Sequence, residues 1–409
     1  MALMTQCRAC LAPHPHLFLA LGDHPPANSF VRPGEQFREL PTYALDAQAC
    51  LECGLIAVAD QIPADFFEHY LYVPSSASSM HVHFAGLASV LKDIAKGGQI
   101  VDIGCNDGLL LSACNAMGCN TVGIDPAANL AEIARTRGVR VEVGYFTSGS
   151  AGPIRDRIGR ASVIVTTNTF NHIGDLHDFM AGVRTLLADD GCFVVEVPWS
   201  KDLLEKNEFD TIYHEHVSEF SLLSLKKLGA FFDLDIVDVH RLDIHGGSMR
   251  VFMRDKRSGA ERAPIVDAML AEELEAGILS AATYEDFADR VKGVGTELAA
   301  MLKGFNEKGL KVAGYGAPAK GNTLLNYFGI GPDKLEYLVD RNALKQGLLS
   351  PGMHIPIRSP DAIVTDAPDV LLVLAWNFFD EIKEQQKEFI ERGGRFLVPL
   401  PTPTIVGAN

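Results

Sequence analysis

The stretch Val101–Gly108 (V-D-I-G-C-N-D-G) has the residue types of a ligand-binding loop between a strand and a helix. Its apolar start predicts a buried parallel strand, and Gly104 and Gly108 lead into the apolar start of a helix. Glycine has no Cβ atom, so a backbone that contains it can approach a ligand closely. The pattern predicts a cofactor loop, although an ordinary strand-to-helix turn without a ligand would share it.

The side chains around this loop favour S-adenosyl-L-methionine over a dinucleotide. A dinucleotide loop has glycine at its middle position, where this chain has Asn106, and the acids Asp102 and Asp107 flank the loop. Carboxylates suit the amino group of a methionine moiety and would repel a diphosphate. About 20 residues further on, Asp125 and Pro126 end a second apolar run. An acid there is placed to accept hydrogen bonds from a ribose.

Further candidates for the cofactor site follow later predicted strands. Tyr145 and Phe146 come after the third strand and are placed to sandwich an adenine, with core packing as the competing role for Phe146. Asn168 begins the segment N-T-F-N-H, which follows the fourth strand and ends in His172. Ligands of such sheets bind at the carboxyl ends of the strands.

Two C-x-x-C pairs lie near the amino terminus, Cys7 with Cys10 and Cys50 with Cys53. Four thiolates supplied as two tight turns suit a tetrahedral zinc ion, and such a Cys₄ site is closed to further chemistry. The chain between the pairs is rich in Pro, Gly and His and would form a marginal core alone. We therefore expect a structural Zn²⁺, with a redox C-x-x-C as the alternative.

The densest polar cluster is Y-H-E-H, which contains Tyr213, Glu215 and His216. Its spacing differs from H-E-x-x-H, so the two histidines would not share a helix face as zinc ligands. Imidazole is a natural base near neutral pH, and Glu215 could orient or tune it. A solvated loop with incidental histidines is the alternative.

A second strand–loop–helix pattern, G-Y-G-A-P-A-K-G-N, contains Tyr315, Lys320 and Asn322. Backbone N–H groups and Lys320 could bind a phosphate there. An NAD site with Asp340 on the ribose is conceivable, but we favour a site for a nucleotide-linked substrate, with a structural turn as the alternative.

The composition is that of an ordinary globular protein: 409 residues, 47% hydrophobic and 22% charged, with a formal net charge of −16. This charge argues against nucleic acid or an anionic membrane surface as a partner. There is no apolar run of about 18 residues, and the start lacks the pattern of a secretion signal. Cysteine usage indicates a reducing cytoplasm, and we expect a monomer or small homo-oligomer.

The apolar runs alternate with helical patterns, which predicts an α/β fold with parallel sheets. We expect strands at 100–103, 121–124, 139–143, 161–165 and 192–197, a hairpin at 234–242 and 248–254, and further strands at 311–315, 335–339, 370–375 and 395–398. The predicted units are a small zinc-binding domain (1–73), a central Rossmann-like methyltransferase domain (74–257) and a C-terminal Rossmann-like domain (258–409) that contributes to substrate binding.

Together, the two C-x-x-C pairs and the motifs V-D-I-G-C-N-D-G, N-T-F-N-H, E-V-P-W, F-D-T-I-Y-H-E-H and G-Y-G-A-P-A-K-G resemble the sugar C-methyltransferases of branched deoxysugar pathways, of the tetronitrose 3-C-methyltransferase type. The resemblance covers essentially the whole chain. It departs at Trp199, where tyrosine is commoner in the family. It implies zinc in the first domain, S-adenosyl-L-methionine in the second, and a dTDP-linked 4-keto-6-deoxy sugar between the second and third.

The resemblance also implies catalytic roles. His216 would remove the proton from the carbon beside the ketone, Tyr213 and His172 would hydrogen-bond the ketone oxygen or neighbouring hydroxyls, and Glu215 would orient the imidazole or contact the sugar. The resulting enolate would then attack the sulfonium methyl group.

A tyrosine before the Ser-Ser run also belongs to the family site, and Tyr72 is preferred here to Tyr70. Two other enzyme classes stay open: an O-methyltransferase with the same cofactor, and an NAD-dependent oxidoreductase that uses the loop at Gly314. A non-enzymatic zinc-ribbon binding protein is a weaker alternative, since it would not need the acid-lined loop.

Overall fold

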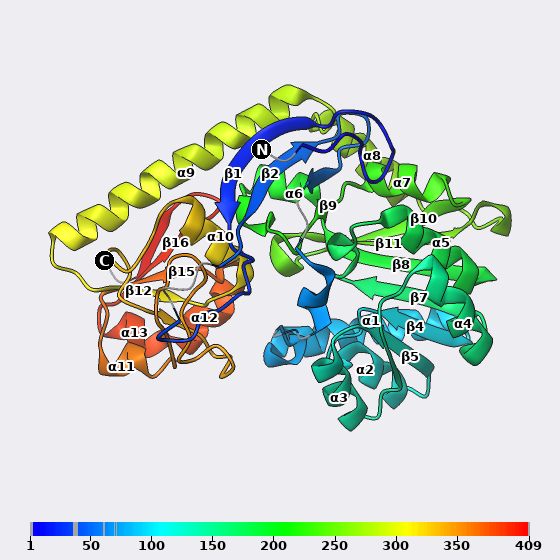
Figure 1. Cartoon of the computed structure of the whole chain (residues 1–409), viewed down its shortest axis with the longest axis horizontal. Helices are drawn as coiled ribbons and strands as arrows, with labels where there is room; N and C mark the ends of the chain where they lie inside the picture. The colour runs from blue at the N-terminus through cyan, green and yellow to red at the C-terminus, as the bar shows by residue number, and fades with distance from the viewer. Residues whose placement is uncertain (1–2, 36–39, 60–61, 69, 71, 408–409) are drawn as a thin grey trace.

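The computed structural model describes residues 3–35, 40–59, 62–68, 70 and 72–407. Two large sheets lie side by side, and the long helix α9 (Ala281–Glu307) passes over the C-terminal sheet and the amino-terminal strand β1 (Figure 1). The amino-terminal strands, blue in Figure 1, lie beneath α9 between the two sheets. Every helix among the described residues is too short or too polar to span a bilayer.

The middle sheet has seven strands in the order β10-β11-β8-β7-β4-β5-β6. The strands β8, β7, β4, β5 and β6 are parallel, and the hairpin β10–β11 closes one edge antiparallel to β8. All five residues of β4 are buried, because a parallel sheet is covered by helices on both faces. The strands are β4 (Gln99–Ile103), β5 (Asn120–Asp125), β6 (Val141–Val143), β7 (Ala161–Thr167), β8 (Leu187–Pro198), β10 (Leu234–Leu242) and β11 (Ser248–Asp255).

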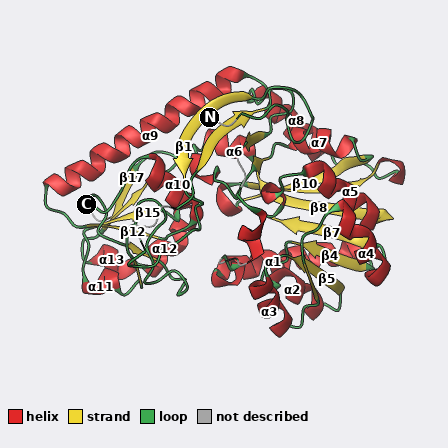
Figure 2. Ribbon diagram, viewed as in Figure 1, coloured by secondary structure: helices red, strands yellow, loops and turns green. Residues whose placement is uncertain are grey.

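Helices cover both faces of this sheet, as the red ribbons of Figure 2 show. The alternation confirms the predicted α/β architecture. The strand predicted at 139–143 is shorter, because only its second half pairs with β5. The helices are α1 (Ser78–Ala95), α2 (Leu109–Ala116), α3 (Ala128–Thr136), α4 (Ser148–Ile158), α5 (Leu176–Leu186), α6 (Ser200–Glu205) and α7 (Leu222–Ala230).

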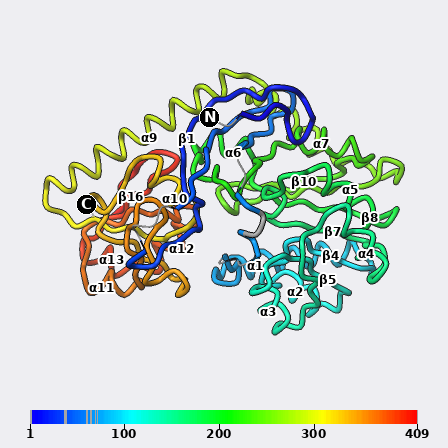
Figure 3. Tube along the Cα trace, viewed as in Figure 1, coloured from blue at the N-terminus to red at the C-terminus, as the bar shows by residue number. Residues whose placement is uncertain are grey.

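The C-terminal sheet has six strands in the order β14-β13-β12-β15-β16-β17, all parallel except β17. It follows α8 (Pro264–Glu275) and α9, and the chain ends beside it (Figure 3). The strands are β12 (Val312–Tyr315), β13 (Leu338–Val339), β14 (Ile357–Arg358), β15 (Val370–Val373), β16 (Arg395–Val398) and β17 (Thr404–Gly407); the helices are α10 (Ala319–Tyr327), α11 (Ala362–Thr365), α12 (Phe379–Gln385) and α13 (Lys387–Glu391).

The amino-terminal segment forms an antiparallel sheet in the order β1-β2-β3-β9. Strands β1 (His16–His24), β2 (Tyr43–Ala49) and β3 (Ile56–Val58) are consecutive, but β9 (Ser218–Glu219) comes from the middle of the chain. Apolar residues of the described part of this segment join the clusters of both other parts, for example Phe18 against Tyr284 of α9, with ring centroids 5.1 Å apart. Its stability therefore depends on the domains around it as well as on the cysteine cluster.

Candidate active site

The four predicted metal ligands lie in one cluster. The Sγ atoms of Cys7, Cys10, Cys50 and Cys53 are all within 4.8 Å of one another, with 3.6 Å between Cys7 and Cys53 and 3.5 Å between Cys10 and Cys50. None of the four forms a disulfide. Four thiolates about 2.3 Å from a tetrahedral zinc ion stand about 3.8 Å apart. The donor set thus fits a closed structural zinc site.

Asp125 shapes the loop that was predicted to hold the methyl donor. One of its carboxylate oxygens accepts the backbone N–H of Asn106 at 2.8 Å, and the other accepts the N–H of Ala127 at 2.8 Å. A carboxylate offers about four lone-pair positions, so acceptor capacity is left for a ribose beside Pro126. The carboxylate of Asp125 therefore stabilises the backbone of this loop, a role that the sequence analysis did not predict.

Two glycines let this loop take its shape. Gly104 has φ of 78°, and a Cβ atom there would lie 2.1 Å from Oγ1 of Thr169. Gly108 has φ of 75°, and a Cβ atom there would lie 2.8 Å from that of Ala134 on α3. Both positions therefore require glycine, the first for the turn itself and the second for the packing of α2 on α3.

The two predicted loop acids differ in whether a cation of the chain already pairs with them. Asp102 is 2% exposed, and its Oδ1 has no hydrogen-bond partner within the described part of the chain. Burial, followed by the negative charges of Asp125 and Glu196, raises the pKa of Asp102 to about 8. Asp107 instead forms an ion pair with Arg137 at 3.1 Å. Asp102 is therefore the acid that fits the amino group of a methionine moiety.

Of the two aromatic residues after β6, one is exposed and the other is buried. Tyr145 is 41% exposed, whereas Phe146 is buried, with its ring centroid 5.2 Å from that of Phe179 on α5. This packing favours the core role that was left open for Phe146, and contact of either ring with an adenine stays a prediction. Asn168, also predicted at this edge, has φ of 50° and is half-buried after β7.

The predicted catalytic residues surround His216. Its Nδ1 lies 3.0 Å from Oε1 of Glu219. Its ring stacks on Tyr213 with centroids 4.2 Å apart, and the ring of His172 is 5.2 Å away. Phe67 stacks on His172 at 5.6 Å. The structure thus brings three of the predicted residues into one cluster and adds Glu219, which the sequence prediction missed.

Burial keeps both imidazoles of this cluster neutral. Burial, followed by the charge of Lys320, lowers the pKa of His216 to about 3. Burial also holds the pKa of His172 well below its usual value, and it raises the pKa of Glu219 while Lys320 opposes that rise. A neutral imidazole is the form that can accept a proton.

Three hydrogen bonds hold the carboxylate of Glu215. It is fully buried and accepts the hydroxyl of Tyr70 at 2.6 Å and the amide of Asn28 at 2.8 and 2.9 Å. Tyr72 is 44% exposed, and its backbone carbonyl accepts the side-chain N–H of Asn106. The phenol that donates to Glu215 therefore belongs to Tyr70, while the choice of Tyr72 as the site tyrosine stays a prediction.

His245 is a further candidate that the sequence reading treated as part of a hairpin turn. It has φ of 56° in the short 3₁₀ helix Ile244–Gly246, and its ring centroid is 6.4 Å from that of Phe378 in the C-terminal part. A Cβ atom at Gly246 would lie 2.4 Å from a carboxylate oxygen of Glu208. The sequence signal that could have identified it is a histidine directly before two glycines, and the left-handed backbone of His245 is the structural sign of a functional position.

Lys320 lies among buried acids with unused hydrogen-bonding atoms. Its Nζ is 4.2 Å from the ring centroid of Trp376, whose Nε1 donates to Oδ2 of Asp210 at 2.8 Å. Among the described residues, Nζ of Lys320 and one oxygen each of Glu208, Asp210 and Glu219 are buried without a hydrogen-bond partner. Buried polar atoms in this state indicate a place for a polar ligand.

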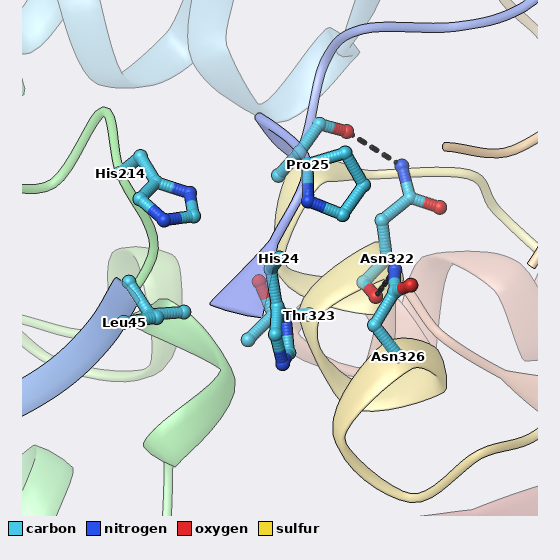
Figure 4. A pocket seen from close by; sticks show the side chains of 8 residues that line it. His24, Pro25, Leu45, His214, Asn322, Thr323 and Asn326 are labelled. Atoms are coloured by element: carbon cyan, nitrogen blue, oxygen red, sulfur yellow. Dashed lines mark hydrogen bonds between the residues drawn. The ribbon is translucent and has the colours of Figure 1, made fainter. Parts of the chain in front are cut away.

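The other two predicted substrate residues have structural contacts. Tyr315 is 5% exposed in the C-terminal core, with its hydroxyl 3.5 Å from Oε1 of Gln385. Asn322 is 1% exposed and donates to the carbonyl of Ala27 at 2.7 Å, which ties α10 to the amino-terminal segment (Figure 4). Oδ1 of Asn322, like Nζ of Lys320, is buried without a hydrogen-bond partner among the described residues, so substrate contact by Asn322 and Tyr315 stays a prediction.

Comparison with known families covers the whole chain in three parts. Residues 7–67 match a zinc binding domain, residues 80–239 match a methyltransferase domain, and residues 243–401 match the C-methyltransferase C-terminal domain. These matches agree with the cysteine cluster, the middle sheet and the C-terminal sheet.

Among characterised proteins, the chain is 39% identical over 408 residues to C-methyltransferase NovU of Streptomyces niveus, covering 99% of this chain and 97% of that protein. It is 31% identical over 117 residues to a ubiquinone biosynthesis O-methyltransferase of Azorhizobium caulinodans, covering 28% of this chain and 45% of that protein. The magnesium protoporphyrin IX methyltransferase of Synechocystis, solved with bound SAH, matches 43% of this chain and 83% of its own at 10% identity with a TM-score of 0.35, too low to carry an argument.

Proposed function

Because the chain belongs to the C-methyltransferases that use S-adenosyl-L-methionine and carry a zinc-binding domain, we propose that its acceptor is a carbon beside the ketone of a nucleotide-linked 4-keto-6-deoxy sugar, with dTDP as the nucleotide. The bound donor supplies an electrophilic methyl group. The chain must then supply a base, donors for the developing oxyanion, and a site that holds the two carbons together.

The observation that supports this proposal is that Tyr70 and Tyr72 connect Glu215 to the loop between Gly104 and Gly108 (the donor loop). The hydroxyl of Tyr70 donates to Glu215, and the backbone of Tyr70 exchanges two hydrogen bonds with Asn129 of α3, at 3.2 and 2.8 Å. Two residues further on, the carbonyl of Tyr72 accepts the side chain of Asn106 in the donor loop. The candidate base, next to Glu215 in the chain, is thereby tied to the loop proposed to hold the methyl donor.

In the proposed mechanism, His216 removes the proton at its Nε2. For this, Nδ1–H donates to Oε1 of Glu219, which fixes the tautomer. Because burial raises the pKa of Glu219, the imidazolium that forms is stabilised when Glu219 is in its ionised form. Tyr213 and His172 border the same space and would donate hydrogen bonds to the ketone oxygen as charge develops on it. Lys320 and the neighbouring acids would bind the remaining polar groups of the sugar nucleotide.

The test is to incubate the enzyme with S-adenosyl-L-methionine and a panel of dTDP-linked 4-keto-6-deoxy sugars. We expect a mass gain of one methyl group and, by NMR, a new carbon–carbon bond beside the ketone. In deuterated water without the donor, the enzyme should exchange the proton on that carbon. A methyl group on oxygen, or no product from any keto sugar, would reject the proposal.

His216→Ala should lower turnover by about 10² to 10⁴-fold, the usual contribution of a general base. Its affinity for S-adenosylhomocysteine, measured by calorimetry, should stay that of the wild type, because His216 is not part of the donor loop. Near-normal methylation by His216→Ala would exclude it as the base.

A further inference from the structure

Arg8 lies inside the first C-x-x-C pair but contacts the chain beside the candidate base. Its Nη1 donates to the carbonyl of Val217 at 2.5 Å, and its Nη2 donates to the carbonyls of Val58 at 2.6 Å and Ala59 at 3.3 Å. Val217 directly follows His216 in the chain. One guanidinium therefore joins the cysteine cluster, the end of β3 and the catalytic segment.

The second C-x-x-C pair holds the other end of the same segment. The hydroxyl of Ser221 donates to the carbonyl of Cys53 at 2.7 Å. Between the two attachments, β9 pairs with β3, with Glu219 opposite Ile56, and the N–H of Val58 donates to the carbonyl of Val217 at 3.2 Å. Residues 217–221 are thus fixed to both pairs, and Glu219 in this stretch contacts Nδ1 of His216.

The charge of Arg8 is best balanced when the cysteine cluster is intact. Within the described residues, no carboxylate forms an ion pair with Arg8, and its partners are neutral carbonyls. A zinc ion with four thiolates has a net charge of about −2, and Arg8 lies between two of the ligands. Loss of the ion would remove the counter-charge of a partly buried guanidinium, which is costly.

We propose that Arg8 is a positioning residue that fixes the segment carrying His216 and Glu219 to the four-cysteine zinc cluster. The zinc site then holds the geometry of the base as well as the fold of the amino-terminal sheet. This inference rests on the proposed role of His216 for its catalytic consequence, but its structural part can be measured without any turnover.

The structural test is hydrogen–deuterium exchange of the holoenzyme, followed in peptides that cover residues 213–221. Arg8→Met should raise amide exchange in these peptides, and removal of zinc by a chelator should raise it in the wild type. Arg160→Met is the matched control, because Arg160 also donates to a backbone carbonyl, that of Leu187 at 2.8 Å, but at the starts of β7 and β8, whereas Phe220 pairs with Trp199 beyond the other end of β8. Unchanged exchange in Arg8→Met, or after chelation, would overturn the proposal.

The catalytic test uses turnover with the accepted keto sugar. Arg8→Met should lower turnover by about tenfold or more while zinc content and affinity for S-adenosylhomocysteine stay normal, and Arg8→Lys should recover part of the loss. If Arg8→Met fails to fold, amide exchange and turnover are both measured on Arg8→Lys. Normal turnover in a variant with raised exchange would overturn the link to His216, whereas absence of keto-sugar methylation in the wild type would reject the proposed function and leave the exchange test intact.

Discussion

Two acids, Asp125 and Asp340, occupy the same place in two different sheets. Asp125 ends the second strand of its unit, and Asp340 directly follows the second strand of its own. Each accepts a backbone N–H from the loop after the first strand: that of Asn106 at 2.8 Å and that of Ala317 at 2.8 Å. Each also accepts the N–H of the residue two positions further along its own chain. The same pair of hydrogen bonds to an aspartate thus stabilises the first loop of both sheets.

The side chains around the two loops differ. Gly104 and Gly316 occupy equivalent turns, with φ of 78° and 87°. Two residues earlier, the middle sheet has Asp102 with an unpartnered oxygen, and the C-terminal sheet has Gly314. The C-terminal loop instead brings in Lys320 from the first turn of α10. The repeated backbone indicates a loop, and the side chains decide which ligand chemistry the loop can serve.

The largest expected difference between the two loops comes from removing the acids. Asp125→Ala and Asp340→Ala should each lose two hydrogen bonds to a carboxylate, about 3 kcal/mol of unfolding free energy in total, measured by urea denaturation. Only Asp125→Ala should also lose affinity for S-adenosylhomocysteine, on the order of 100-fold by calorimetry. An equal loss of affinity in Asp340→Ala would mean that the donor does not bind in the middle sheet alone.

Asp102→Asn should weaken donor binding by about 30-fold, because it removes a charge-assisted contact worth about 2 kcal/mol. Burial raises the pKa of Asp102 to about 8, and an ammonium ligand favours the ionised form. Wild-type affinity for S-adenosylhomocysteine should therefore rise between about pH 6 and pH 7.5 as binding releases the proton. The same pH slope in Asp102→Asn would exclude Asp102 as its source.

The raised pKa of Asp102 also predicts how stability depends on pH. The folded protein without ligand holds this proton up to about pH 8, while an unfolded aspartate releases it near pH 3.9. The contribution of Asp102 to stability therefore falls as pH rises through that range. Asp102→Asn should remove this part of the slope, which denaturant titrations at several pH values would measure.

The smallest expected effect concerns the C-terminal loop. Lys320→Met should lower kcat/KM for the sugar nucleotide by about tenfold, the value of one charge-assisted contact, and should leave affinity for S-adenosylhomocysteine unchanged. Steady-state kinetics and calorimetry would measure the two effects separately. A loss of donor affinity would show that the two loops do not serve separate ligands.

Local sequence patterns were sufficient for the parts of this protein that form from neighbouring residues. The runs 234–242 and 248–254 were predicted as a hairpin and are β10 and β11, apart from one further residue. The cysteine spacing likewise predicted the cluster, because each pair closes within its own turn. Apolar runs of strand length, bounded by glycine and acid, identified the first strands of both sheets.

Side-chain direction was harder to predict, because it depends on what packs against each position. Phe146, Tyr315 and Asn322 have the right types for ligand contacts, yet distant residues of the core or of the amino-terminal segment cover them. Likewise, only the fold decides that the phenol of Tyr70 reaches Glu215, 145 residues further on.

The sequence by itself determined the two loop types, the cysteine cluster and the Y-H-E-H motif proposed to be catalytic, since each is made of residues a few positions apart. Tertiary structure alone decided that β9 joins the amino-terminal sheet and that Arg8 reaches Val217, 209 residues away. The physical reason is that β9 has only two residues, and so short a strand is held by the long-range pairing and burial around it.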